Sequence, residues 1–336
     1  MHPRLSAAKY LTMCVVVLIL GAHSLRAQKF EFGPGSEKKI YSPETGCEFE
    51  LGAEITCVDR MSTSDQPSWN DDVNRKGTIG IFEIEIYDAS QTNSPQSISP
   101  KLPTIFVVGD STANNDANGG RGWGDPFIDL FDTTKVNVLN RARAGRSSRT
   151  FITQGWWDYV LSDMKRGDIV LIQFGHNDAG AINDASRARG SLPGIGEETQ
   201  EIDNLLTKEH EVVHTYGWYL RKMIADTKAK GAIPIVLSLT VRNIWKDGRV
   251  ERGSGKFGQW AREVATSQHV LFLDVTKLIA DKYEQLGETK VKELFATDHT
   301  HTNSAGAELN ASLILAGLKT LKGKEVERLL NHRLHR

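Results

Sequence analysis

Five short apolar runs, separated by segments of helical periodicity, limit the folds open to this chain. Runs of this length and composition are typical of strands buried on both faces of a sheet. Their alternation with helices predicts an α/β fold, a doubly wound five-stranded parallel sheet. The apolar runs are 104–110, 136–140, 168–174, 233–239 and 270–275, and the helical segments are 123–131, 148–163, 209–230, 257–268, 276–286 and 304–321.

The first 27 residues have the layout of a secretory signal peptide. Basic residues, among them Arg4 and Lys9, precede an uncharged stretch at 10–25, and Ala27 is the small residue of a cleavage site. The apolar core is shorter than the about 20 residues that a spanning helix needs, so an uncleaved membrane anchor is the weaker alternative. We expect residues 1–27 to be removed and the mature protein to be periplasmic or secreted, without stable membrane insertion.

The rest of the chain divides into a small N-terminal part and a larger C-terminal part. Residues 28–97 contain alternating segments such as KFEFG, CEFEL and GIFEIEIYDA, which predict a small β-rich accessory domain. Residues 98–103 complete a Ser- and Pro-rich linker to an α/β domain at 104–322. The remaining residues, 323–336, form a basic tail that we expect to be a frayed amphipathic end.

Two cysteines, Cys47 and Cys57, remain after signal cleavage. The segment between them, CEFELGAEITC, is symmetric about Gly52 and alternates on both sides, which predicts a hairpin. In an oxidising compartment, the two cysteines are expected to form a cross-strand disulfide. Two buried thiols are the alternative.

The net charge of the chain limits the kinds of molecule that it can bind. A formal net charge of -1 excludes a strongly basic nucleic-acid-binding chain. Loss of Arg4, Lys9 and Arg26 with the signal peptide makes the mature chain slightly acidic. An anionic polymer would therefore need a local basic patch.

Polar residues follow the first three apolar runs, where the carboxyl ends of parallel strands form one edge of the sheet. Ser111, in GDST, can expose its hydroxyl there, although a helix-capping serine is the alternative. Gly145, in RARAGRSS, allows a close approach of substrate to a backbone N–H. Asn177, in GHND, is a neutral donor suited to an oxyanion hole, and an Asx turn is its alternative.

The segment DHTH, ahead of the last long helix, brings together a carboxylate and an imidazole. Asp298 and His301 are three residues apart, so Asp298 can orient the imidazole while the other ring nitrogen takes a proton from a serine. A metal site built on His299 and His301 is the competing hypothesis. It is disfavoured because no other His/Cys motif has ligand spacing.

In order, GDST, Gly145, GHND and DHTH resemble the four blocks of the SGNH (GDSL-type) hydrolases. The likeness is closer to the rhamnogalacturonan acetylesterases of that group, and it covers about residues 103–321. It also runs through SLPGIGEETQEIDN and DHTHTNSAGAELNA. The first block has Thr112 where many GDSL enzymes have Leu, and Thr is common in the pectin-active branch.

The resemblance implies a flavodoxin-like fold and a secreted esterase that removes acetyl groups from the rhamnogalacturonan backbone of pectin. Ser111 would be the nucleophile, with its backbone N–H, the Gly145 N–H and Asn177 forming the oxyanion hole. His301 would be the general base, oriented by Asp298. No metal or organic cofactor is implied.

The long segment 179–208 has no clear period and follows Asn177, so we expect it to border the site. Arginines in it or near Gly145 could contact a uronate carboxylate, and Trp123 could stack on a sugar ring. Solvated surface arginines are the alternative. The arginine candidates are Arg187 and Arg189, together with Arg143, Arg146 and Arg149.

Two alternatives to a pectin acetylesterase remain at this stage. The first is an esterase that deacetylates another polysaccharide, such as xylan. The second is a non-catalytic carbohydrate-binding protein on the same scaffold, which the presence of Ser111, Asp298 and His301 disfavours. We expect the protein to be a monomer.

Overall fold

The fold is taken from a computed structural model, which describes residues 99–252 and 255–332 and, before residue 99, the backbone of six strands. The chain separates into two compact units, residues 1–97 and 98–336. In the described part of the chain, no helix combines the length and the apolarity needed to cross a membrane.

The first unit contains two three-stranded sheets, ordered β2-β1-β6 and β3-β4-β5. The antiparallel pairing of β4 with β5 places Cys47 opposite Cys57, as in the expected hairpin. The side chains of this unit lie outside the described residues, and the disulfide therefore stays a prediction. The signal peptide and the accessory domain stay predictions as well. The strands are β1 (Met13–Gly21), β2 (Ser24–Glu31), β3 (Lys39–Ser42), β4 (Cys47–Glu50), β5 (Thr56–Cys57) and β6 (Ile86–Asp88).

The second unit is built on a five-stranded sheet in the order β15-β12-β9-β7-β8, and all of its neighbouring strands are parallel. This confirms the predicted sheet. The chain leaves the inner strand β7 for the edge strand β8 and then returns to β9 on the other side of β7. The switch lies between β7 and β9, where ligands of such sheets bind. The strands are β7 (Thr104–Gly109), β8 (Asn137–Asn140), β9 (Ile169–Gln173), β12 (Ile233–Leu237) and β15 (Leu271–Leu273).

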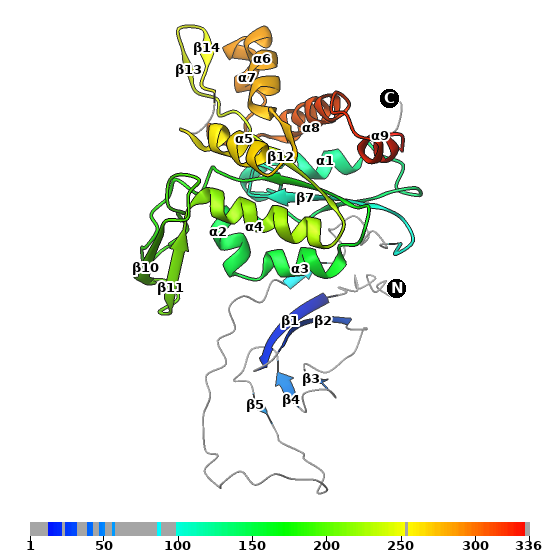
Figure 1. The fold of residues 1–336 in the computed structure, drawn as a ribbon, viewed down its shortest axis with the longest axis vertical. Helices are drawn as coiled ribbons and strands as arrows, with labels where there is room; N and C mark the ends of the chain where they lie inside the picture. The colour runs from blue at the N-terminus through cyan, green and yellow to red at the C-terminus, as the bar shows by residue number, and fades with distance from the viewer. Residues whose placement is uncertain are drawn as a thin grey trace, which may run out of the picture. The chain divides into compact units, whose positions relative to one another are not determined.

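Helices cover both faces of this sheet (Figure 1). Alternate side chains of β7 serve the two cores: Ile105 and Val107 face one, and Phe106 and Val108 face the other. The first core contains residues of α1 (Gly124–Ile128), α6 (Val275–Leu286), α7 (Glu288–Lys292), α8 (Ser304–Leu318) and α9 (Lys324–Leu330). The second contains residues of α2 (Ser148–Thr153), α3 (Trp156–Asp163), α4 (Tyr216–Ala229) and α5 (Phe257–Ser267).

Two of the predicted helices are wrong in extent. The segment 148–163 forms two helices, because Gly155 takes a φ of 78° between α2 and α3. The segment 209–230 begins as a strand, and its helix starts only at Tyr216, after Thr215 caps it by accepting from the Trp218 N–H. The strand is β11 (His210–His214), which pairs with β10 (Thr199–Asp203) in an antiparallel hairpin.

The prediction of a frayed C-terminal tail is also wrong. Residues 324–330 form α9, and Val326, Leu329 and Leu330 are buried in the first core. The apolar residues of VERLL recur at helical spacing, so this segment has an apolar face to bury despite its basic composition.

A second short hairpin, β13 (Trp245–Lys246) with β14 (Arg249–Val250), follows β12.

Candidate active site

Three side chains that are distant in sequence form a continuous hydrogen-bonded chain at the carboxyl edge of the sheet. The Ser111 Oγ lies 2.9 Å from the His301 Nε2. The His301 Nδ1 lies 2.7 Å from the Asp298 Oδ2. An imidazole held between a hydroxyl and a carboxylate can take the hydroxyl proton and so activate the oxygen as a nucleophile.

Asp298 fixes the orientation of His301. Its Oδ1 accepts from the backbone N–H groups of Thr300, at 2.6 Å, and His301, at 2.8 Å. Burial raises the pKa of Asp298, but hydrogen bonds from His301 and Thr300 outweigh burial and lower the pKa to about 2. An ionised Asp298 accepts a hydrogen bond from the Nδ1–H of His301, which leaves an unprotonated Nε2 as the acceptor facing Ser111.

The loop that carries His301 is tied down on both sides. The Ala296 N–H donates to the His301 carbonyl at 2.9 Å, and Asn303 caps α8 by accepting from the Gly306 N–H. Thr302 exchanges hydrogen bonds with Arg121, which lies in the segment between β7 and α1: the Arg121 N–H donates to the Thr302 carbonyl, and the Thr302 hydroxyl donates to the Arg121 carbonyl. These bonds hold His301 beside the loop that carries Ser111.

His299 lies in the same loop but in a different environment. It is exposed, and its backbone carbonyl accepts from the Asn243 N–H at 2.7 Å. Among the described residues, no group of three or more His, Cys, Asp or Glu side chains could hold a metal ion.

Strand pairing brings the two other predicted donors to the same edge. The Arg143 N–H donates to the Gly109 carbonyl at 2.9 Å, which places the Gly145 loop beside the end of β7. Gly109 is also paired with Gln173 at the end of β9, four residues before Asn177. Gly145 has a φ of 76°, in the region that favours glycine. The Asn177 Nδ2 donates to the Arg146 carbonyl at 2.8 Å, which links the two loops.

The residue after Asn177 joins three segments in a way that the sequence did not reveal. The buried Asp178 Oδ1 accepts from the Ser148 hydroxyl at 2.5 Å and from the Ser191 hydroxyl at 3.0 Å. Burial raises the pKa of Asp178 to about 6, while the hydrogen bonds from Ser148 and Ser191 partly oppose it. The network fixes the Asn177 loop to the start of α2 and to the segment that follows it in the chain.

Trp123 was predicted to stack on a sugar ring, and this is wrong. Its side chain is wholly buried, with its Nε1 donating to the Gln173 Oε1 at 2.8 Å. Its ring meets that of Phe127 edge-on, with centroids 5.5 Å apart. The flanking glycines allow this burial: a Cβ at Gly122 would lie 2.2 Å from the Ala113 carbonyl carbon.

The arginine candidates separate into four environments. Arg189 and Arg146 lie at Gly145: the Arg189 Nη1 donates to the Gly145 carbonyl at 3.1 Å, and the Arg146 Nε donates to the Gln154 Oε1 at 2.8 Å. Arg143 stacks on Trp156, with its guanidinium carbon 4.1 Å from the ring centroid. Arg187 is exposed. Arg149 is wholly buried, so the hypothesis that it contacts substrate is wrong.

A small hollow adjoins the imidazole on the side of the Asp298 loop. Its volume is about 120 Å³, and it lies between the loop after β7 and the loop that carries His301. The hollow is lined by Asn115, Ala117, Asn118, Ala296, Thr297, Asp298 and His301.

Comparison with known proteins assigns this chain to a family. Residues 107–309 match the GDSL-like Lipase/Acylhydrolase family. The chain belongs to this family. The predicted SGNH (GDSL-type) resemblance is therefore confirmed, and the chain is a carboxylic ester hydrolase.

Two curated relatives are acetylesterases by name. The rhamnogalacturonan acetylesterase of Emericella nidulans is 32% identical over 212 residues, which cover 63% of this chain and 83% of that protein. The probable rhamnogalacturonan acetylesterase YesY of Bacillus subtilis is 27% identical over 224 residues, which cover 65% of this chain and 93% of that protein. This chain is accordingly an acetylesterase of the GDSL/SGNH group.

A solved structure supports the fold alone. The crystal structure of protein YxiM from Bacillus subtilis matches with a TM-score of 0.52 and 24% identity. The match covers 65% of this chain and 56% of that chain.

Proposed function

We propose that this acetylesterase removes O-acetyl groups from the rhamnogalacturonan backbone of pectin, with Ser111 as the nucleophile. The observation that carries the proposal is the hydrogen-bonded chain from the Ser111 Oγ through His301 to Asp298, at 2.9 and 2.7 Å. The protein that contains this chain of hydrogen bonds belongs to an ester-hydrolysing family. Two of its relatives are named as rhamnogalacturonan acetylesterases.

The proposed reaction has two halves. In the first, the Ser111 Oγ attacks the acetyl carbonyl carbon while the His301 Nε2 takes the hydroxyl proton. The negative oxygen that forms is stabilised by the N–H groups of Ser111 and Gly145 and by the Asn177 side chain. The intermediate collapses, the sugar hydroxyl leaves with the proton from His301, and the acetyl group stays on Ser111.

In the second half, water replaces the sugar. His301 takes a proton from the water, whose oxygen attacks the acetyl carbonyl. The same donors stabilise the second oxyanion. Collapse returns the proton to the Ser111 oxygen and releases acetate, so the enzyme is restored without a cofactor.

The arginines around Gly145 support an anionic polymer as the substrate. Arg146 and Arg189 lie at Gly145, and Arg143 and Arg187 lie on the same two loops, after β8 and β9. Guanidinium groups bind carboxylates with paired hydrogen bonds, and the galacturonate units of this polymer carry one carboxylate each. Because the whole chain has a net charge of only -1, attraction of such a polymer has to be local.

We also propose that the enzyme works outside the cytoplasm, after cleavage of residues 1–27. The basic start and the short apolar core support this proposal. The N-terminal sequence of the protein recovered from culture medium or periplasm tests it, with Gln28 expected as the first residue.

The substrate proposal is tested by acetate release from three esters: acetylated rhamnogalacturonan, acetylated xylan and a small aryl acetate. The enzymes are the natural protein, Ser111→Ala, and Ser162→Ala as a control at an exposed serine of α3. We expect release mainly from rhamnogalacturonan, retained in Ser162→Ala and lost in Ser111→Ala. Release from xylan or the aryl ester alone would keep the serine mechanism and reject the pectin assignment.

A further inference from the structure

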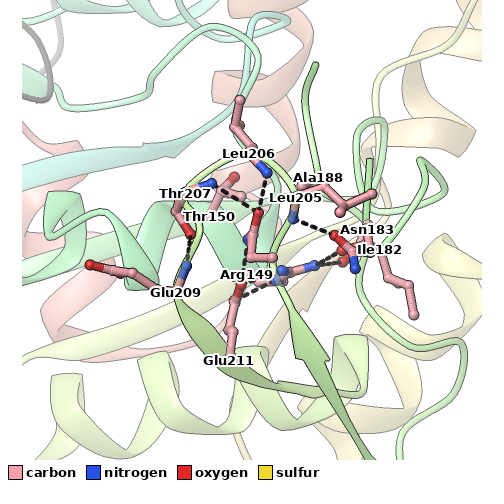
Figure 2. Close-up of polar contacts among 12 residues, drawn as sticks. Arg149, Thr150, Ile182, Asn183, Ala188, Leu205, Leu206, Thr207, Glu209 and Glu211 are labelled. Atoms are coloured by element: carbon pink, nitrogen blue, oxygen red, sulfur yellow. Dashed lines mark hydrogen bonds and ion pairs between the residues drawn. The ribbon is translucent and has the colours of Figure 1, made fainter. Parts of the chain in front are cut away.

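Arg149 is a buried arginine whose guanidinium binds three separate parts of the chain (Figure 2). Its Nη1 donates to the carbonyls of Ile182, at 2.7 Å, and Gly190, at 2.8 Å. Its Nε donates to the Glu211 Oε1 at 2.7 Å, and its Nη2 donates to the Glu211 Oε2. All three nitrogens are thus engaged, and the ion pair is bidentate.

Glu211 extends this contact into the β10–β11 hairpin. Burial raises the pKa of Glu211, but hydrogen bonds from Arg149 and Asn204 outweigh burial, so the pKa is below its ordinary value and the carboxylate is ionised at neutral pH. The Asn204 Nδ2 donates to the Glu211 Oε2 at 2.8 Å, and the Asn204 Oδ1 accepts from the N–H groups of Leu206 and Thr207. The turn of the hairpin is therefore fixed to the same ion pair.

Asn183 links the hairpin to the preceding segment a second time. Its Nδ2 donates to the Asp203 carbonyl at 3.0 Å, and its Oδ1 accepts from the Leu205 N–H at 2.8 Å. The segment 182–190, held at both ends by Arg149, carries Arg187 and Arg189. Arg189 reaches the Gly145 carbonyl, so the fixed segment borders the proposed oxyanion hole.

Stability alone does not explain an arginine in this position. Taking both charges out of water costs free energy, and apolar residues of similar volume commonly stabilise a core as well or better. An apolar side chain cannot bind two carbonyls and a carboxylate at once, whereas the planar guanidinium can. The benefit of the ion pair is therefore the fixed placement of the segments that it joins.

We propose that Arg149 and Glu211 are positioning residues that hold the segment 182–190 and the β10–β11 hairpin beside Gly145 for contact with the polymer. The identity of the polymer in this proposal rests on the proposed function. It predicts a division between substrates: a small ester needs only Ser111, His301 and the oxyanion donors, whereas the polymer also needs the positioned segment.

The first test compares KM and kcat on the two substrate types. Glu211→Gln keeps the shape of the side chain and removes the negative charge that Arg149 binds. We expect KM for acetylated rhamnogalacturonan fragments to rise about tenfold, with kcat on an aryl acetate within about twofold of the natural enzyme. Equal losses on both substrates would indicate a general structural role and overturn the proposal, as would an unchanged KM for the polymer.

The matched control is Glu284→Gln. Glu284 is also a largely covered glutamate paired with arginines, Arg249 and Arg252, but it lies on α6, away from Gly145. Its side chain is 15% exposed, against 18% for Glu211. We expect both KM values to be unchanged in Glu284→Gln. If KM for the polymer rose similarly in Glu284→Gln, the loss of any arginine-paired glutamate would have the same effect, and the proposal would be overturned.

The second test needs no substrate. Hydrogen–deuterium exchange of the backbone amides in 182–190 and 199–214 is expected to accelerate in Glu211→Gln and to stay unchanged in Glu284→Gln. Unchanged exchange in a folded Glu211→Gln would overturn the proposal. This readout still decides the question if the natural enzyme releases no acetate from the polymer, in which case only the proposed substrate fails.

A milder variant covers the case in which Glu211→Gln does not fold. Asn183→Ala removes the two hydrogen bonds to Asp203 and Leu205 and leaves the buried ion pair intact. We expect a smaller rise in KM for the polymer and faster exchange in 182–190. If both remain as in the natural enzyme, the hairpin does not position this segment and the proposal fails.

Discussion

At the scale of single residues, two histidines of one loop have different surroundings. The His301 ring contacts Ser111 and Asp298, whereas His299 is exposed and uses its backbone carbonyl to accept from Asn243. His301→Ala is expected to lower kcat on an aryl acetate at least about 10²-fold, because the proton of Ser111 loses its acceptor. His299→Ala is expected to stay within about threefold of the natural enzyme. Comparable losses in the two variants would mean that His301 is not the base.

The residues on either side of Asn177 are predicted to make opposite contributions to the pH dependence of the free energy of unfolding. Burial lowers the pKa of His176 to about 4 from 6.5, and it raises the pKa of Asp178 to about 6 from 3.8. Below pH 6.5 the unfolded chain protonates His176 before the folded protein does, so the free energy of unfolding falls as the pH drops. The folded protein protonates Asp178 first, so this residue raises the free energy of unfolding over a similar range.

Single substitutions separate these two opposing contributions. Between pH 7 and pH 4.5, His176→Gln is expected to lose about 2 kcal/mol less stability than the natural protein, and Asp178→Asn about 2 kcal/mol more. Denaturant unfolding at the two pH values measures both. Three parallel pH profiles would show that neither group titrates as its burial implies.

The residues of the hydrogen-bonded chain, Ser111, His301 and Asp298, could be singled out from the sequence because each is chemically distinctive and follows a strand or precedes a helix. Asp298 and His301 are also close in sequence, so local geometry joins them. The roles of Trp123 and Arg149 were not predictable, because an aromatic ring or a guanidinium serves equally well at a surface or in a core. Arg149 finds its partners 33, 41 and 62 residues away, where only the tertiary fold brings them together.

At the scale of elements, Gly155 separates α2 from α3. Its φ of 78° is strained for any residue with a Cβ, so Gly155→Ala is expected to lower the free energy of unfolding by about 1 kcal/mol. Gly258 is the control, because it lies in the helix α5 and a Cβ there would lie 3.8 Å from the Ser238 Cβ, an ordinary contact. Gly258→Ala is expected to leave stability unchanged or to raise it by about 0.5 kcal/mol. Equal effects in urea unfolding would contradict this account.

The element boundaries show what periodicity could and could not decide. The five strands of the parallel sheet were predicted because uninterrupted apolar runs of this length are typical of strands covered on both faces. The β10–β11 hairpin was missed because Val212 and Val213 continue the apolar pattern of α4 and so read as its first turn. Thr215, whose side chain caps α4, was the local signal that could have placed the start of the helix.

At the scale of the whole domain, the C-terminal helix α9 belongs to the core rather than to a loose tail. Leu329 is wholly buried in the same apolar cluster as residues of β7 and α8. Leu329→Ala is expected to lower the free energy of unfolding by about 2–5 kcal/mol, a large share of the stability of a typical domain. Leu205, 49% exposed in the hairpin, is the control, and Leu205→Ala is expected to change stability by about 0.5 kcal/mol or less. Equal unfolding midpoints would place α9 outside the cooperative core.

The sheet order explains why the proposed reacting groups, which are distant in sequence, meet. The switch between β7 and β9 opens the carboxyl edge of the sheet at Ser111, and the loops after β8 and β9 bring Gly145 and Asn177 to it. The loop before α8 then supplies His301. The order of strands was predicted only through the family resemblance, because periodicity alone does not say which buried strands are neighbours.

The central claim is that the Ser111 oxygen is the nucleophile and that His301 activates it. It is tested most directly by reacting the protein with a serine-directed phosphonate and locating the adduct by mass spectrometry. A single adduct on Ser111 is predicted, with a labelling rate that falls sharply in His301→Ala and is kept in His299→Ala. An adduct on another residue, or labelling of Ser111 at the same rate without His301, would contradict the account.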